Sequence, residues 1–213
     1  MYDGIILDMD GTIWDSTEEV AEAFKEVLKN KYPEVTDEVT VEKLKGLFGQ
    51  LLDDIAVQLY RSVPPEKAIK IMEECCEYEC EYLAKHNAKI FPGMEQTIEE
   101  LSKKYKLFIV SNCQEGYIQC FFAANPHLEK YFTDYEYPGR SGKAKAENIR
   151  MVVLRNNLKN PIYIGDTAGD AKAAKEAGIP FVFARYGFGD VEEYDAVVDS
   201  PIELLELFNE DTK

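Results

Sequence analysis

The sequence GIILDMDGT at residues 4–12 decides the fold of this 213-residue chain. Its four leading residues are typical of a short buried strand, and the glycine near its end is typical of a turn. Asp8 and Asp10 stand two positions apart, so on an extended chain both carboxylates point to the same side. At the carboxyl end of a parallel strand they would face the crevice where open α/β sheets bind ligands. Like charges at that spacing need a cation, a proton or hydrogen bonds to compensate them.

Polar side chains also follow two later apolar runs. The run at residues 107–110 ends in Ser111 and Asn112, and the run at residues 161–164 ends in GDTAGD at 165–170. Both runs are typical of short buried strands. Each ending alone has an ordinary explanation, because serine and asparagine favour turns and helix caps and aspartates favour the first turn of a helix. The order in which these segments occur along the chain is therefore stronger evidence for a shared site than any one segment is.

Together with a lysine-containing loop at residues 142–145, these segments resemble the four motifs of the haloacid dehalogenase superfamily of aspartyl-phosphate hydrolases. DxDGT at 8–12 resembles the first motif, the serine–asparagine pair the second, a loop lysine the third and GDxxxD at 165–170 the fourth. The resemblance covers the whole chain, including an insertion just after the first motif. It implies an enzyme that hydrolyses phosphate esters.

The resemblance also implies a role for each motif residue. Asp8 would attack phosphorus and form an aspartyl-phosphate, and Asp10 would act as general acid and then as general base. The metal would be Mg²⁺, which prefers oxygen ligands, and one ion can be shared only if Asp8 and Asp166 lie within ~8 Å of each other. The expected metal ligands are Asp8, Asp10 through its backbone carbonyl, Asp166 and, directly or through water, Asp170; the groups expected to hold the phosphoryl oxygens are Thr12, Ser111 and Asn112.

The third motif is where the chain departs from relatives of the phosphoglycolate phosphatase type. Their loop reads KPxP before a helix, and the loop at residues 142–145 contains no proline. Counting back from Ile149 by the usual spacing selects Lys143, whereas a shorter loop of the form lysine–small–Glu–Asn–Ile selects Lys145. We expect one of these two lysines to reach the site and favour Lys145.

Periodicity divides the chain into a helical insertion and a part that forms a sheet. Residues 15–88 carry helical stripes and no clear strand pattern, with helices expected over 17–30 and 66–85. Later in the chain strands and helices alternate, which is typical of a parallel sheet. The further strands are expected at 107–110, 162–164, 181–183 and 196–198. The predicted class is therefore α/β, a parallel sheet with a helical insertion. The family resemblance implies a Rossmann-like core at residues 1–14 and 89–213 and an inserted all-helical cap at 15–88.

Composition favours an enzyme of the cytoplasm. The net charge of −16 argues against binding to nucleic-acid backbones or to anionic membranes. No apolar run approaches the ~18 residues of a membrane span, and the first apolar stretch lacks the preceding basic region of a signal peptide. The five cysteines are an odd number, which indicates free thiols in a reducing compartment. The expected partner is a small phosphate ester, with the protein a monomer or a dimer.

Three functions remain open, of which hydrolysis is favoured. Dehalogenases of this superfamily lack the second aspartate, so Asp10 argues against dehalogenation. A phosphomutase of the β-phosphoglucomutase type would carry a histidine just after the first motif, and residues 15–30 contain none. A non-catalytic phosphate-binding or interaction module would usually have lost Asp8 or Asp10, and both are present. We predict a Mg²⁺-dependent phosphatase for a small metabolite such as a phosphoglycolate-like or sugar-phosphate-like ester; the substrate itself depends on the cap.

Overall fold

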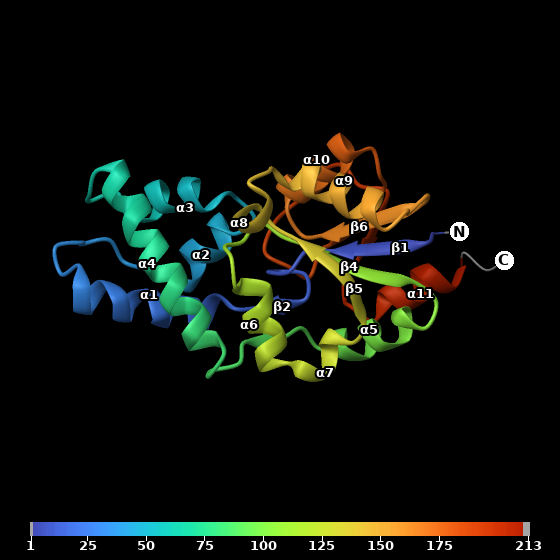
Figure 1. The fold of residues 1–213 in the computed structure, drawn as a ribbon, viewed down its shortest axis with the longest axis horizontal. Helices are drawn as coiled ribbons and strands as arrows, with labels where there is room; N and C mark the ends of the chain where they lie inside the picture. Colours follow the sequence, from blue (N-terminus) through green and yellow to red (C-terminus); the bar gives the residue numbers. More distant parts are fainter. Residues whose placement is uncertain (1, 211–213) are drawn as a thin grey trace.

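A computed structural model describes residues 2–210. Within them, six strands form one parallel sheet in the order β5-β4-β1-β6-β7-β8 (Figure 1). The chain winds outward from β1 through β4 to β5, then returns to the other side of β1 with β6. The predicted α/β class is confirmed. The strands are β1 (Gly4–Leu7), β4 (Lys106–Val110), β5 (Phe132–Glu136), β6 (Pro161–Gly165), β7 (Phe181–Ala184) and β8 (Ala196–Val198).

Alternate residues of β1 pack into opposite helical layers. Ile5 and Leu7 belong to a cluster with side chains of helices α5, α6 and α11, whereas Ile6 belongs to a cluster with α9 and α10. Because both faces of the sheet are covered, its central strands are continuous apolar runs. Burial of each such side chain contributes roughly 1.5–3 kcal/mol. The helices of the core are α5 (Met94–Ser102), α6 (Tyr117–Ala124), α7 (Pro126–Glu129), α8 (Pro138–Ser141), α9 (Lys145–Arg155), α10 (Ala168–Ala177) and α11 (Glu203–Glu210).

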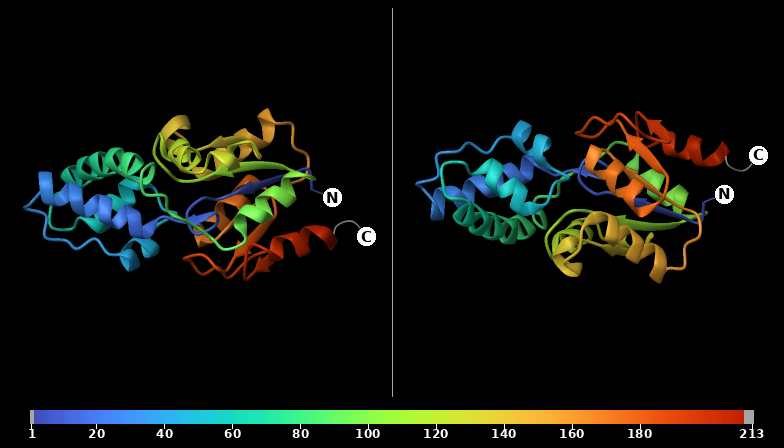
Figure 2. Two further views of the ribbon diagram at one scale, coloured as in Figure 1. Left: turned by 90° about the horizontal axis from the view of Figure 1, so that it is seen from below. Right: turned by 90° about the horizontal axis from the view of Figure 1, so that it is seen from above.

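Four of the helices between β1 and β4 stand apart from the sheet. They lie beyond the carboxyl ends of the strands, at one end of the molecule in every view (Figures 1 and 2). Helices α1 and α3 both pack against the long helix α4. Helix α4 ends two residues before the predicted boundary at 85. The four helices are α1 (Thr17–Lys31), α2 (Val41–Leu47), α3 (Leu52–Leu59) and α4 (Pro65–Leu83).

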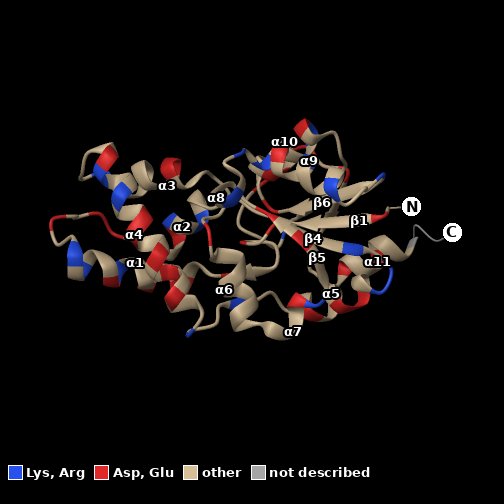
Figure 3. Cartoon of the chain, viewed as in Figure 1, with Lys and Arg blue, Asp and Glu red and all other residues tan. Residues whose placement is uncertain are grey.

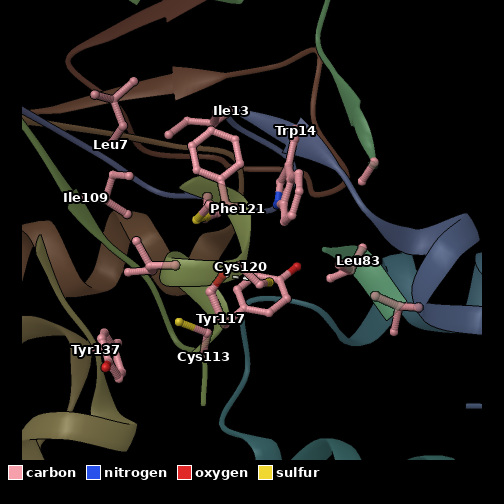
Figure 4. Packing of buried hydrophobic residues seen from close by; sticks show 14 of the residues in the cluster. Leu7, Ile13, Trp14, Leu83, Ile109, Cys113, Tyr117, Cys120, Phe121 and Tyr137 are labelled. Carbon is pink, nitrogen blue, oxygen red and sulfur yellow. Dashed lines mark hydrogen bonds between the residues drawn. The ribbon is translucent and has the colours of Figure 1, made fainter. Parts of the chain in front are cut away.

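A short antiparallel ribbon joins this insertion to the core. Strand β2 (Trp14–Asp15) pairs with β3 (Lys89–Ile90), so the chain leaves and re-enters the core at adjacent points. The Trp14 ring makes edge-on contacts with Tyr117 and Phe121, with ring centroids 5.7 and 5.0 Å apart (Figure 4). These aromatic contacts anchor the ribbon to helix α6.

Three strands were not predicted from the sequence: β2, β3 and β5. The first two have only two residues each, too few to show a period. Strand β5 is an edge strand of sequence FTDYE, whose acidic residues pair with arginines of neighbouring helices. Its polar residues conceal it from a search for apolar runs. No helix within residues 2–210 combines the length and the apolar character needed to cross a bilayer.

Candidate active site

Three aspartates from different segments meet at the carboxyl edge of the sheet. Asp8 follows β1, Asp166 follows β6, and Asp170 lies in the first turn of α10. Each offers a carboxylate oxygen, and these oxygens lie within 4.8 Å of one another. All three side chains are buried. Asp8 and Asp166 are therefore close enough to share one ion, as the sequence analysis required.

The lysine that reaches this cluster is Lys145. Its Nζ lies 3.1 Å from Asp8 Oδ1 and 2.6 Å from Asp170 Oδ1, and its side chain is buried. Burial alone would lower the pKa of Lys145, but the charges of Asp170 and Asp8 raise it overall, so the ammonium stays charged. Lys143 instead lies half exposed, 3.7 Å from Glu147. The structure thus brings together one of the two candidate lysines and leaves the other at the surface.

The electrostatics of the cluster suit a divalent cation. Burial raises the pKa of Asp8, with the Asp170 charge adding to the effect and Lys145 opposing it. Asp166, with the same neighbours, also has a pKa well above its ordinary value, mainly through burial. Asp8 Oδ1 is buried, and its partner is the Lys145 ammonium 3.1 Å away. Three buried carboxylates share this one ammonium, and the excess negative charge fits a hard ion such as Mg²⁺.

Local backbone geometry holds the two aspartates of the fourth motif. Asp170 Oδ2 accepts hydrogen bonds from the backbone N–H groups of Asp166 and Thr167, forming a capping box at the start of α10. Asp166 Oδ2 accepts a hydrogen bond of 2.8 Å from the Phe188 backbone N–H. Asp170 therefore has both the functional position and the helix-capping role that the sequence allowed.

Thr12 is turned toward Asp166. Its Oγ1 donates to Asp166 Oδ1 at 3.2 Å, and its side chain is fully buried. The turn before it depends on Gly11, which has φ +80° and packs so closely on the Asp166 carboxylate that any Cβ would overlap it. The Thr12 hydroxyl thus donates to a neighbouring carboxylate, and a phosphoryl contact from Thr12 stays a prediction.

Asp10 lies in a separate hydrogen-bonded group. Its Oδ1 accepts hydrogen bonds of 2.6 Å from Ser16 Oγ and from Tyr117 OH. Burial raises the pKa of Asp10 to about 6, although both hydroxyl donors lower it. A carboxyl group in that range can release and take up a proton near neutral pH.

Ser111 and Asn112, at the end of β4, line a cavity of about 40 Å³ together with Asp8 and Asp10. Its opposite wall belongs to the helical insertion. Asn112 Nδ2 donates to the Gly49 carbonyl of the insertion at 2.9 Å, and Asn112 Oδ1 is buried without a hydrogen bond. The serine–asparagine pair therefore lies at the site and also contacts the insertion.

Three residues that complete the site were not predicted from the sequence: Ser16, Glu79 and Tyr117. Ser16 and Tyr117 bond Asp10, but a hydroxyl outside a motif gives no signal in the sequence. Glu79 is different, because it interrupts the apolar face that α4 forms with Cys75, Cys76 and Leu83. A charged residue on the buried face of a helix is a signal that periodicity could have revealed.

The surface outside the site does not favour anions. Acidic residues are spread over α1, α4 and α5 (Figure 3). Any attraction for a phosphate group must therefore come from groups inside the site, such as Lys145.

A buried cluster of carboxylates and one lysine at the switch point of a parallel sheet defines a hydrolase-like α/β site. The family model for haloacid dehalogenase-like hydrolases matches residues 5–184, and the chain belongs to that family. The resemblance recognised from the four motifs is confirmed.

Individual relatives are distant but match along nearly their whole length. A phosphoglycolate phosphatase of Vibrio parahaemolyticus is 24% identical over 217 residues, covering 95% of this chain and 94% of the relative. One from Aquifex aeolicus is 25% identical over 220 residues, covering 96% of each. A haloacid dehalogenase-like hydrolase of Streptococcus pneumoniae superposes with a TM-score of 0.82 at 23% identity, covering 97% of this chain and 98% of that one.

Proposed function

We propose that this protein is a Mg²⁺-dependent phosphatase that hydrolyses a small phosphate monoester through an aspartyl-phosphate on Asp8. The observation that carries the proposal is the buried Asp8 carboxylate, which lies among the carboxylates of Asp166 and Asp170 and the ammonium of Lys145. Family membership and the names of the two curated relatives support the same reaction.

In this mechanism Asp8 attacks phosphorus in line with the leaving alcohol. Lys145, charged and fixed between two carboxylates, neutralises negative charge beside the attacking oxygen. Asp8, Asp166, the Asp10 carbonyl and, directly or through water, Asp170 would hold Mg²⁺, which supplies positive charge to the phosphoryl oxygens. Because Asp170 already accepts several hydrogen bonds, we assign it mainly the positioning of Lys145 and of the turn that carries Asp166.

Asp10 transfers the proton in both halves of the reaction. In its protonated form it donates to the leaving alkoxide, and as a carboxylate it then takes a proton from the water that attacks the aspartyl-phosphate. The hydroxyls of Ser16 and Tyr117 fix its orientation. Ser111 and Asn112 would bind the phosphoryl oxygens with hydroxyl and amide groups.

Residues 15–88 would form the cap of this enzyme, and residues 1–14 and 89–213 its core. The β2–β3 ribbon joins the two parts, and the Asn112–Gly49 hydrogen bond connects them across the cavity. A closed cap would exclude bulk water from the site during phosphoryl transfer. We also propose a cytoplasmic location, in which the free cysteines stay reduced.

The test is a panel of phosphate monoesters assayed for released phosphate with Mg²⁺, with EDTA, and with Mg²⁺ restored. We expect release that EDTA abolishes and Mg²⁺ restores. A trapped phosphate on Asp8, detected by mass spectrometry after acid quenching, would identify the intermediate. Conversion of β-glucose 1-phosphate to glucose 6-phosphate with little free phosphate would contradict hydrolysis and favour a mutase.

A further inference from the structure

Glu79 is a buried carboxyl group that the mechanism above does not use. It lies on α4 of the insertion, and only 4% of its surface is exposed. It lines the same cavity as Asp8 and Asp10, on the wall that faces the core. Asp8 and Asp10 thus line one side of this cavity, and Glu79 lines another.

Glu79 has no cationic partner among the residues that the structure describes: every ion pair there involves other groups. Its Oε2 accepts a hydrogen bond of 3.1 Å from Gln114 Nε2, which lies on the core side of the cavity. Burial raises the pKa of Glu79 well above its ordinary value, and the nearby Cys80 and Asp10 add to this. A buried carboxyl group without a counter-charge keeps its proton, and it ionises when a cation binds beside it.

The rest of the insertion side of the cavity is apolar. The cavity is narrow, about 40 Å³, and because Asp8 and Glu79 both line it, a short alcohol is enough to reach from one to the other. The side chains that form this apolar wall are Val20, Phe24, Phe48, Leu52, Ile55 and Met72. Glu79 is therefore the charged feature with which the insertion can distinguish one alcohol from another.

We propose that Glu79 selects the alcohol part of the substrate, and that the preferred substrate is a small phosphate monoester whose alcohol carries an ammonium group. The inference rests on the proposed phosphatase function and specifies its substrate class. With the phosphate held at Asp8, a short alkyl chain lies against the apolar wall and its ammonium pairs with Glu79. The ammonium supplies the missing counter-charge, whereas a carboxylate at the same position adds another anion.

Four two-carbon esters that differ in one terminal group test this selection. They are phosphoethanolamine, 2-hydroxyethyl phosphate, ethyl phosphate and phosphoglycolate, with ammonium, hydroxyl, methyl and carboxylate ends. We expect kcat/KM in that order for the wild type, with at least about a tenfold difference between the first and the last. Glu79→Gln keeps the shape and removes the charge, so it should lower the ratio of kcat/KM for phosphoethanolamine to kcat/KM for ethyl phosphate about tenfold or more.

The matched control is Glu81→Gln, which removes the same charge from an exposed position on the same helix. It should leave the order of the four esters intact. Hydrolysis that favours phosphoglycolate, or an order that Glu79→Gln does not alter, would overturn the role of Glu79 while the phosphatase function stands. Failure to hydrolyse these esters and p-nitrophenyl phosphate alike would overturn the phosphatase function and the inference with it.

Discussion

The core and the helical insertion line the two sides of one cavity with different kinds of side chain. The core side carries Asp8, Asp10 and Ser111. Asp8 pairs with the Lys145 ammonium, and Asp10 accepts hydrogen bonds from two hydroxyl groups. The insertion side is an apolar wall with one carboxyl group, Glu79, and one backbone carbonyl, that of Gly49. This difference separates chemistry from selectivity: core substitutions should slow every substrate alike, and insertion substitutions should act through closure or substrate choice.

The largest effect is expected from Asp8→Asn. The substitution removes the nucleophile and keeps the volume, so kcat should fall about 10⁴-fold or more for every ester that the wild type accepts. Steady-state assays on the four-ester panel measure it, with circular dichroism as the check on folding. A variant that keeps more than a tenth of the wild-type activity would refute Asp8 as nucleophile.

The two loop lysines give the next contrast. Lys145→Met should lower kcat about 10²–10³-fold, because Asp8 and Asp170 lose their counter-charge. Lys143→Met, two residues away and exposed, should leave kcat within about twofold, as surface changes usually do. Lys145→Arg keeps the charge and serves as a second variant if the methionine variant folds poorly. Equal losses from the two methionine variants would mean that the loop, and not the buried ammonium, matters.

Substitutions of two glycines in the insertion test whether the insertion closes over the core. Gly49 has φ +89°, and a Cβ there would lie 3.0 Å from Thr167 Cγ2 of the core. Gly49→Ala should therefore strain the closed form by about 1–2 kcal/mol and lower kcat/KM about tenfold. Gly46 lies in α2 with open space around it, so Gly46→Ala should leave kcat/KM unchanged and raise stability by up to about 1 kcal/mol. Equal kcat/KM values for the two variants would argue against a role of Gly49 in closure.

The smallest effect is on stability at the edge of the sheet. Burial would raise the pKa of Glu136, but hydrogen bonds from Arg140 and Arg155 lower it overall. A folded-state pKa below the unfolded one gives stability that is present above about pH 4.3 and lost as pH falls through the folded value. Glu136→Gln should cost about 1 kcal/mol at pH 7, since the arginines are partly exposed, and the cost should fade in acid.

Urea unfolding of wild type and Glu136→Gln at pH 7 and in the acid range measures this difference. The rate of hydrolysis at pH 7 should stay close to that of the wild type, because Glu136 does not line the cavity. A difference in unfolding free energy that grew as the pH fell would reverse the sign of the linkage.

The sequence alone was sufficient to predict the site residues that directly follow strands. Apolar runs located β1, β4 and β6, and the polar residues after them fell at one edge because parallel strands end together. The choice between Lys143 and Lys145 depended on the turn that follows α8, which no periodicity describes. The orientation of Thr12 depended on the left-handed turn at Gly11, and the partners of Asp10 came from segments without a motif.

Strand β1 lies between β4 and β6, and both of these neighbours follow it at a long distance along the chain. Gly4 pairs with Lys106 on one side and with Pro161 on the other, so β1 is covered only after these distant segments have been synthesised. The contacts of α1 to α4 are closer in sequence, and local contacts form faster because less chain must be closed into a loop.

We therefore expect the insertion to fold before the sheet closes, with the nucleophile assembled among the last elements. Refolding followed in parallel by far-ultraviolet circular dichroism and by regain of activity measures this order. Activity that returned together with the helical signal would contradict it. A chain released before β6 is complete would carry Asp8 but would lack both Asp166 and the strand that pairs with β1 on one side. Such an incomplete product of synthesis would be inactive.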